Sequence, residues 1–260
     1  MTDIGNVNQE ALFDQLADEY DLLLGDWKED LKSQGRQLDA LFRRYAGSPV
    51  QTVLDCTCGI GTQSIGLGLL GYRVTGTDIS GKSVQRARQE AARFNLDIEF
   101  AKADLRHLDQ TVSKTFDAVI SCDNSLPALL TPEDVRAALG QMARRIEPSG
   151  ICVISIRNFE RILAQKTRFN PRHLHEVDGR RVIVFDVWDY LENGLVRFNV
   201  FFLKENDGGW DVACRQMVYR ALYREDLTAE LSRCGFKEIE ILDRLDGEPL
   251  PFDFYVCSRR

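Results

Sequence analysis

The chain has 260 residues, enough for one large α/β domain or one domain with an insertion, and its 44% hydrophobic and 28% charged residues are typical of a soluble globular protein. Its net charge of −7 argues against a broad nucleic-acid footprint, which needs clustered Lys and Arg. No apolar run approaches the length of a membrane span, and residues 1–5 show no basic-then-apolar signal sequence. We therefore expect a cytoplasmic protein without a nucleic-acid or membrane partner.

The cysteines favour buried thiols over disulfides or a metal site. There are seven, an odd number, and several fall inside apolar segments that are predicted to be buried strands. Cys56 and Cys58 are separated by one residue, but no group of Cys or His with ligand spacing follows them. We expect reduced, core-like thiols and no bound metal.

Two helices are predicted before the first strand. Residues 8–24 carry apolar residues four positions apart, as on one face of a helix. Asp26 can cap a second helix, which ends at the Gly-Ser-Pro sequence of residues 47–49. Because these helices precede the first strand, we expect them to cap the sheet. Tyr20 and Trp27 either pack in the core or close over a bound ligand.

The first predicted strand leads into a loop of small residues. Residues 53–55 form a short apolar strand that stops at the acid Asp55, and a helix is expected over residues 62–70. Gly59 and Gly61 in the intervening loop have no Cβ, so a ligand can lie against the backbone there. This strand, loop and helix are half of a doubly wound α/β fold, whose ligands bind beyond the carboxyl ends of the strands.

A second acid follows at the end of the next strand. Residues 73–77 are predicted to form that strand, and Asp78 comes 19 positions after Gly59. This spacing suits a carboxylate that accepts hydrogen bonds from two ribose hydroxyls. The dinucleotide-binding fingerprint is not met, because Thr57 and Ser64 stand where its first and third glycines would be.

The two acids, the loop and the helix resemble the first motif of class I S-adenosylmethionine-dependent methyltransferases. The resemblance implies S-adenosylmethionine as the cofactor, with the loop wrapped around it. The alternative is an α/β domain in which this loop is only a tight turn. The cofactor site that the resemblance implies comprises Tyr20, Trp27, Asp55, Cys56, Thr57, Cys58, Gly59, Gly61, Thr62, Asp78 and Ile79.

Two later strand ends extend this implied site. Asp104 and Leu105 follow the third predicted strand, and in the methyltransferase pattern such an acid accepts from the adenine amino group while the next side chain packs on the ring. The alternative is a capping aspartate in a surface loop. Cys122 and Ser125 follow the fourth strand, residues 116–121, and are assigned to the cofactor site as well.

The section after residue 165 has a different pattern. Residues 181–189, 195–204 and 210–219 alternate apolar and polar side chains, which is typical of half-buried antiparallel strands. Asn-Gly and Asp-Gly pairs between them are strong hairpin signals. We predict a three-stranded meander that forms a lid, inserted before a last helix over residues 225–234.

The predicted fold is α/β, a doubly wound domain with a seven-stranded, mostly parallel sheet, an N-terminal helical cap and the inserted meander. After the fifth strand, residues 151–156, a hairpin of residues 236–242 and 252–257 closes the sheet with its last strand antiparallel. By analogy, this is the class I methyltransferase architecture. The sections of the single domain are the cap (1–48), the cofactor-binding core (49–165), the lid (166–222) and the C-terminal helix and strands (223–260).

A narrower resemblance concerns the methyl acceptor. Residues 122–126 and 155–163 are similar to the corresponding stretches of the glycine and the glycine/sarcosine N-methyltransferases. The resemblance implies that Asn124 contacts the substrate and that Arg157 grips its carboxylate, to which a guanidinium can form two parallel hydrogen bonds. Tyr219 lies in a segment similar to the one that supplies an active-site tyrosine.

The resulting hypothesis is N-methylation of a small amine that bears a carboxylate, such as glycine or sarcosine. No catalytic dyad is evident, which fits a reaction that mainly requires a nucleophile held in line with the methyl group. Leu23 stands where these enzymes have a tyrosine, with Tyr20 as a substitute, so another small carboxylate-bearing amine is an equal candidate.

Several alternatives stay open at this point. The enzyme could methylate a hydroxyl of a metabolite or natural product instead of an amine. The chain could also be a cofactor-binding partner subunit without catalysis, with the meander as its interaction surface. Arg157 could pair with Asp123 or another carboxylate of the chain instead of a substrate. A monomer and a homo-oligomer are equally open.

Overall fold

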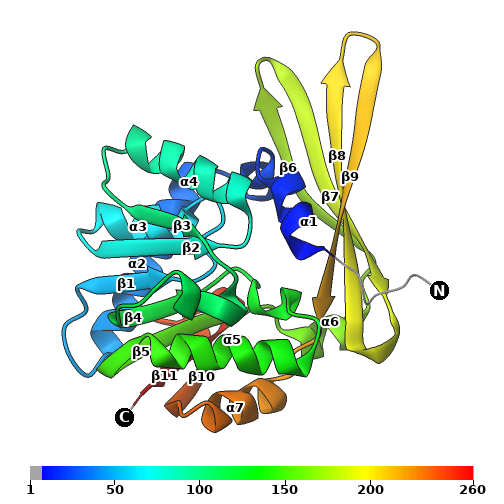
Figure 1. Ribbon diagram of the computed structural model, residues 1–260. Coiled ribbons are helices and arrows are strands. Elements are labelled where there is room, and N and C mark those ends of the chain that lie inside the picture. Colours follow the sequence, from blue (N-terminus) through cyan, green and yellow to red (C-terminus); the bar gives the residue numbers. More distant parts are fainter. Residues whose placement is uncertain (1–7, 260) are drawn as a thin grey trace.

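Seven strands form the main sheet in the order β10-β11-β5-β4-β1-β2-β3 (Figure 1). The computed structural model describes residues 8–259, so the first seven residues of the predicted cap and the last residue lie outside it. Neighbouring strands are parallel, except that β11 runs antiparallel to both β5 and β10, which confirms the predicted fold class. The strands are β1 (Thr52–Asp55), β2 (Arg73–Asp78), β3 (Glu99–Lys102), β4 (Phe116–Ser121), β5 (Ile146–Ile156), β10 (Lys237–Leu245) and β11 (Glu248–Ser258).

Helices pack against both faces of this sheet through apolar stripes. On one face, Phe42 of α2 belongs to a buried cluster with Val53 and Ile120. On the other face, Leu139 of α5 and Leu227 of α7 share a second cluster with other strand residues. Within residues 8–259, none of the helices is both long and apolar enough to span a bilayer. The helices are α1 (Gln9–Leu16), α2 (Trp27–Tyr45), α3 (Thr62–Leu69), α4 (Gly81–Arg93), α5 (Pro132–Arg144), α6 (Phe159–Gln165) and α7 (Arg224–Arg233).

Helices α2 and α3 cross with their backbones in contact. A Cβ on Gly66 of α3 would lie 2.1 Å from the carbonyl oxygen of Leu31, and a Cβ on Gly35 of α2 would lie 2.6 Å from the backbone of Gly66. Trp27 of α2 also donates from its indole Nε1 to the hydroxyl of Thr62, at 2.9 Å. These contacts fix the start of α3, and therefore the glycine loop that precedes it.

The single helix predicted over residues 8–24 is wrong. Helix α1 ends at Leu16, and a separate 3₁₀ helix, η2 (Tyr20–Leu23), follows. Tertiary partners stabilise the break, because Arg86 of α4 donates to the carbonyl of Ala17 at 2.7 Å. Glu19 is buried and forms an ion pair with Arg215 of the lid at 3.0 Å.

The lid is a four-stranded antiparallel sheet, so the prediction of three strands is wrong. Its strands are β6 (Phe169–Val177), β7 (Arg180–Tyr190), β8 (Leu195–Asn206) and β9 (Gly209–Arg220), in that order. The missed strand, β6, contains Pro171 and a register shift between Pro171 and His173, which interrupts the alternation on which strand prediction depends. The lid follows α6, precedes α7 and projects beside the main sheet, with α1 between the two (Figure 1). The division into one domain with four sections stays a prediction.

Candidate active site

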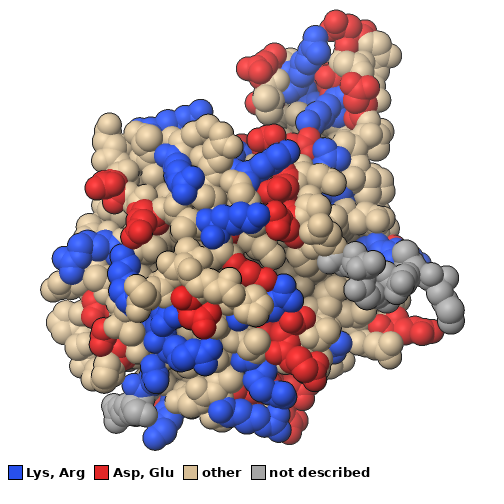
Figure 2. Space-filling model, viewed as in Figure 1, with Lys and Arg blue, Asp and Glu red and all other residues tan. Residues whose placement is uncertain are grey.

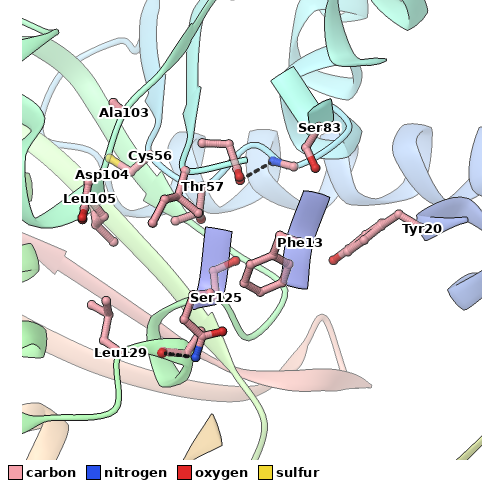
Figure 3. A pocket seen from close by; sticks show the side chains of 15 residues that line it. Phe13, Tyr20, Cys56, Thr57, Ser83, Ala103, Asp104, Leu105, Ser125 and Leu129 are labelled. Atoms are coloured by element: carbon pink, nitrogen blue, oxygen red, sulfur yellow. Dashed lines mark hydrogen bonds between the residues drawn. The ribbon is translucent and has the colours of Figure 1, made fainter. Parts of the chain in front are cut away.

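A cavity opens beyond the carboxyl ends of β1, β2 and β3, the edge at which the sequence predicts the cofactor (Figure 3). Its walls come from these strand ends, the turn after β4 and the N-terminal segment. The predicted cofactor residues that line it are Tyr20, Cys56, Thr57, Gly59, Asp78, Ile79, Asp104, Leu105 and Ser125. The lining residues that sequence reasoning missed are Gln9, Phe13, Ser83, Ala103, Ala128 and Leu129.

Asp78 at the end of β2 is held by the backbone and still has free acceptor capacity. Its Oδ2 accepts from the backbone N–H of Gly59 at 2.9 Å, and its Oδ1 accepts from the N–H of Ser80 at 2.8 Å. Each carboxylate oxygen has further lone pairs that can accept from a ribose hydroxyl. Gly59 has a φ of 53°, and a Cβ there would meet no atom within 4 Å, so open space lies against its backbone. Burial raises the pKa of Asp78.

Asp104 after β3 is fixed by Arg106. The guanidinium of Arg106 forms ion pairs with Asp104 at 2.6 Å and with Asp134 at 2.9 Å. Burial alone would raise the pKa of Asp104, but the hydrogen bonds from Arg106 outweigh it, and the pKa is lowered. Asp104 therefore presents a charged acceptor at the rim of the cavity, beside the apolar side chains of Ala103 and Leu105.

The N-terminal segment supplies the opposite wall. Figure 3 shows Phe13 and Tyr20 across the cavity from Ala103 and Leu105. Gln9 of the same segment donates from Nε2 to the carbonyl of Ala128 at 2.9 Å. Sequence reasoning missed Gln9 and Phe13 because only the packing of α1 against distant strands and turns places them here.

Asp55 supports the loop from beneath instead of lining the cavity. It is fully buried, and its carboxylate accepts from Ser64 Oγ at 2.7 Å and from the N–H of Thr57 at 3.4 Å. Burial raises the pKa of Asp55 to about 7, and the two hydrogen bonds offset only part of this effect. Asp55 thus links the loop to the first turn of α3.

The other predicted cofactor residues also stand behind the cavity. Trp27 and Thr62 hydrogen-bond to one another, and Gly61 adopts a φ of 95° as the cap residue before α3. Cys58 and Cys122 are buried, free thiols. These residues position the loop, and any direct contact that they make with a cofactor stays a prediction.

Asn124 joins the ends of β4 and β5. Its Oδ1 accepts from the backbone N–H of Arg157 at 3.0 Å, and its own N–H donates to the carbonyl of Ser155 at 3.0 Å. Its side-chain Nδ2 is buried and donates no hydrogen bond within residues 8–259. Since a buried amide without a partner is costly, this donor is a candidate for contact with a substrate.

Arg157 extends its guanidinium into an aromatic recess. Its Cζ lies 5.8 Å from the ring centre of Trp188, 5.7 Å from that of Phe198 and 5.4 Å from that of Phe252. No carboxylate of residues 8–259 forms an ion pair with it, and the alternative pairing with Asp123 is not formed. Burial lowers the pKa of Arg157, and the nearby positive charge of Arg172 lowers it further.

Tyr219 of β9 lies in the same recess. Its ring packs edge-on against Phe198 with the ring centres 4.9 Å apart, and its hydroxyl donates to the sulfur of Met217 at 3.3 Å. Burial raises the pKa of Tyr219 to about 12, although the nearby positive charges of Arg157 and Arg172 counteract the shift. The fold therefore brings Asn124, Arg157 and Tyr219 together from β4, β5 and β9.

Sequence reasoning missed a buried ion pair on the inner face of the lid. Arg172 of β6 bonds to Asp186 of β7 at 2.8 Å, with side chains only 16% and 2% exposed. Trp188 donates from its indole Nε1 to the same carboxylate at 3.2 Å. Arg172 also donates to the carbonyl of Leu23, at 3.3 Å, and so ties the lid to the N-terminal segment. No signal in the sequence pairs these residues.

The charged side chains do not mark a further site on the face that Figure 2 shows. Figure 2 shows Lys and Arg mixed with Asp and Glu over the core and the projecting lid, so neither sign dominates this face. Within the part of the chain that the structure describes, no three His, Cys, Asp or Glu residues are grouped as metal ligands would be. The cavity and the recess around Arg157 are therefore the features that carry the functional argument.

Residues 53–150, which contain the glycine loop and the walls after β2, β3 and β4, match a family model described as a methyltransferase domain. These residues form a methyltransferase domain, and the chain shares its fold with an S-adenosylmethionine-dependent methyltransferase from Clostridium acetobutylicum. The cofactor of this methyltransferase domain is S-adenosylmethionine. The polar and apolar walls of the cavity fit it, because Asp78 can accept from ribose hydroxyls and the space at Gly59 admits a ligand against the backbone.

Named relatives agree with this assignment. The chain is 29% identical over 245 residues to a glycine/sarcosine/dimethylglycine N-methyltransferase of Actinopolyspora halophila, covering 92% of this chain but only 40% of that enzyme. It is 32% identical over 176 residues to human glycine N-methyltransferase, covering 61% and 59% of the two chains. Its fold is similar to that of S-adenosylmethionine-bound CalS10, an amino pentose methyltransferase from Micromonospora echinaspora, with a TM-score of 0.73, 19% identity and 88% and 92% of the chains covered.

Proposed function

We propose that this methyltransferase transfers a methyl group to the nitrogen of a small amine that carries a carboxylate. The observation that supports it is the guanidinium of Arg157, which lies among three aromatic rings without an ion-pair partner in residues 8–259. A buried charge is stabilised when it is paired and hydrogen-bonded. A substrate carboxylate would supply the missing partner through two parallel hydrogen bonds.

The cofactor site and the Arg157 recess meet at the ends of β4 and β5. S-adenosylmethionine, when bound, supplies an activated methyl group on a sulfonium. The residues that would hold it are Asp78 for the ribose and Asp104 and Leu105 for the adenine. Asn124 lies between the cofactor cavity and the Arg157 recess, and its Oδ1 accepts a hydrogen bond from the backbone N–H of Arg157.

The chain's own residues act by positioning the acceptor. Burial raises the pKa of Tyr20 far above its ordinary value and that of Tyr219 to about 12, so both hydroxyls stay protonated at neutral pH. They can hydrogen-bond to the acceptor but cannot act as bases. In this proposal the amine binds in its neutral form, with its carboxylate on Arg157 and the side-chain amide of Asn124 beside it.

The names of the relatives support an amine acceptor in particular. Glycine, sarcosine and dimethylglycine appear in the name of the Actinopolyspora enzyme, and an amino sugar in that of CalS10. Of these, the amino acids carry a carboxylate and match an unpaired arginine. The aromatic rings around Arg157 would also suit a methylated ammonium group, which binds favourably to ring faces.

The test is a substrate panel read by mass spectrometry. Protein and S-adenosylmethionine are incubated with glycine, sarcosine, dimethylglycine, other small amino acids and matching amines without a carboxylate. We expect turnover only with carboxylate-bearing amines, and a rise of at least about 100-fold in KM for Arg157→Ala with cofactor affinity unchanged, since a charged hydrogen-bonded pair is lost.

Two variants make this test specific. Arg157→Lys keeps the charge but not the planar fork, so it should recover only part of the affinity. Arg168→Ala is the matched control, because Arg168 is 69% exposed and pairs with Asp189 at the edge of the lid. Turnover of amines that lack a carboxylate, or wild-type kinetics in Arg157→Ala, would refute the proposed substrate class and leave the cofactor site standing.

A further inference from the structure

We propose that Asp123 binds the α-ammonium group in the methionyl part of the cofactor. Three features of the structure carry this inference, namely the position of Asp123 along the sheet, its backbone conformation and the lack of a cationic partner for its carboxylate within residues 8–259. The inference rests on the cofactor site and does not depend on which methyl acceptor the enzyme uses.

The first feature is the order of the strand ends. Ala103 and Leu105 follow β3, Asp78 ends β2, and the glycine loop follows β1. With the ribose on Asp78, the methionyl part extends away from the adenine, past β1 and toward β4. Adjacent strands are about 4.8 Å apart, so the end of β4 lies roughly 10 Å along this path from β2. Asp123 is the second residue after β4, two positions before Ser125 of the cavity wall, and it borders a neighbouring pocket together with Gln34 and Gln63.

The second feature is the backbone at this point. Asp123 and Asn124 have φ values of 55° and 67°, two consecutive left-handed residues that are not glycine. Ser155 fixes this conformation, because its Oγ accepts from the N–H of Asp123 at 2.9 Å and its carbonyl accepts from the N–H of Asn124. Strained backbone of this kind persists where neighbours hold it and is concentrated at ligand sites. In this conformation the side chain of Asp123 contacts Gln63, whereas that of Asn124 contacts the backbone of Arg157.

The third feature is that, among residues 8–259, the groups that donate to the carboxylate of Asp123 are neutral. Its Oδ2 accepts from Gln63 Nε2 at 2.8 Å, and Gln34 also bonds to it. The positive charge of Arg157 stabilises this carboxylate only at longer range. No cationic side chain of residues 8–259 forms an ion pair with Asp123. Burial raises the pKa of Asp123, although the hydrogen bonds from Gln63 and Gln34 counteract the shift. An ammonium group supplies three donors and the missing positive charge.

The structure favours the ammonium group over the sulfonium and over the acceptor amine. Gln63 belongs to the first turn of α3 and Gln34 to α2, so their bonds draw the carboxylate to the α2–α3 side of the glycine loop. The methyl group must instead face Arg157 and the lid, where the acceptor binds. A methionyl tail that continues past the glycine loop to the α2–α3 side would bring its ammonium group to the carboxylate of Asp123.

Asp123→Asn is the sharpest variant for a test. Asparagine adopts left-handed φ values readily and still offers an oxygen to Gln63, so it removes the charge with little change in shape. Asp178→Asn is the matched control, because Asp178 also has a left-handed φ, of 51°, and lies exposed in the turn between β6 and β7.

The measurement is calorimetric binding of three probes to wild type and both variants. The probes are S-adenosylhomocysteine, its deaminated analogue with hydrogen in place of the α-amino group, and 5′-methylthioadenosine, which lacks the amino-acid part. We expect Asp123→Asn to lower the affinity for S-adenosylhomocysteine about 10-fold or more, while the affinities for the other two probes change less than about twofold. Asp178→Asn should bind all three as wild type does.

Other outcomes would overturn the inference. An equal loss for the deaminated analogue would mean that Asp123 only shapes the site. S-adenosylmethionine is titrated as a fourth ligand, and a loss of affinity for it but not for S-adenosylhomocysteine would place the carboxylate at the sulfonium. Unchanged binding of every probe would remove Asp123 from the cofactor site, whereas a failure of the substrate panel alone would leave this inference intact.

Discussion

The cofactor side and the acceptor side of the site carry charges of opposite sign. Around the cavity, the strand ends and loop present buried carboxylates, with Asp55, Asp78 and Asp123 all raised in pKa by burial. Around the acceptor recess, the buried charge without an ion-pair partner in residues 8–259 is the positive one of Arg157, whereas that of the nearby Arg172 is paired with Asp186. This arrangement suits a cationic cofactor on one side and an anionic substrate on the other.

The two sides also differ in how the chain builds them. Asp78 is tied to Gly59, 19 positions away, and Asp55 to Ser64, nine positions away. The recess instead combines Arg157 with Trp188 and Phe252, from three different parts of the chain. The comparison teaches that the cofactor side is a local motif, while the acceptor side is a product of long-range packing. The following changes test either side separately.

Breaking the lid's buried ion pair should have the largest effect. Asp186→Asn leaves Arg172 buried without its partner, and we expect the free energy of unfolding to fall by about 3–5 kcal/mol in urea denaturation. Asp207→Asn is the control, because Asp207 bonds to Arg180 at 2.9 Å in the same sheet but is 92% exposed. Its loss should stay below about 0.5 kcal/mol. Equal effects of the two changes would show that burial does not distinguish them.

The buried carboxyl group of Asp55 predicts that the stability of the folded protein depends on pH. Because the pKa of Asp55 is about 7 in the folded protein and 3.8 as its ordinary value, the folded state binds its proton more tightly. This contribution to stability is complete below about pH 4 and is lost as the pH rises through about 7, amounting to roughly 4 kcal/mol. Asp55→Asn has no such proton, so its stability relative to wild type should rise across this window. A constant difference between the two proteins would contradict the prediction.

Removing the negative charge of Asp78 should weaken binding of the cofactor without changing binding of the methyl acceptor. We expect Asp78→Asn to raise the Kd for S-adenosylhomocysteine about 10-fold to 100-fold, since hydrogen bonds to a charged group contribute about 1.5–3 kcal/mol. The KM for the methyl acceptor at saturating cofactor should be unchanged. Asp97→Asn, at an exposed position before β3, is the control and should bind as wild type does. A rise in acceptor KM would show that the two sides are not separable.

The smallest effect is expected at the support of the glycine loop. Thr62→Val leaves the indole N–H of Trp27 without its acceptor, which should cost about 1–2 kcal/mol of stability. The same change in a Trp27→Phe background should cost less, because the donor is already absent. A double-mutant cycle of chemical denaturation measures the difference, and additive effects would mean that this bond contributes nothing measurable.

What could be predicted follows from how local each feature is. The fold class was predicted correctly, because strand ends, acids and glycines recur at short spacing along the chain. The helix over residues 8–24 was wrong because Arg86 and the lid stabilise a break at Ala17 that local propensity does not show. The lid's first strand was missed because Pro171 and a bulge disrupt its alternation. The roles of individual site residues stay predictions, and the cavity adds Phe13 and Gln9 to them.

The sequence by itself determined the framework of the cofactor side, including Asp55, Gly59 and Asp78, because a strand, its loop and the next strand end are adjacent in the chain and in space. Only the tertiary structure decided the neighbours of Asp123 and Arg157. Gln63 is 60 positions from Asp123, and Phe252 is far from Arg157 in the chain. The physical reason is that the energy of a buried charge depends on all the groups that the fold packs around it. These groups come from distant parts of the chain, so no local pattern of residues specifies them.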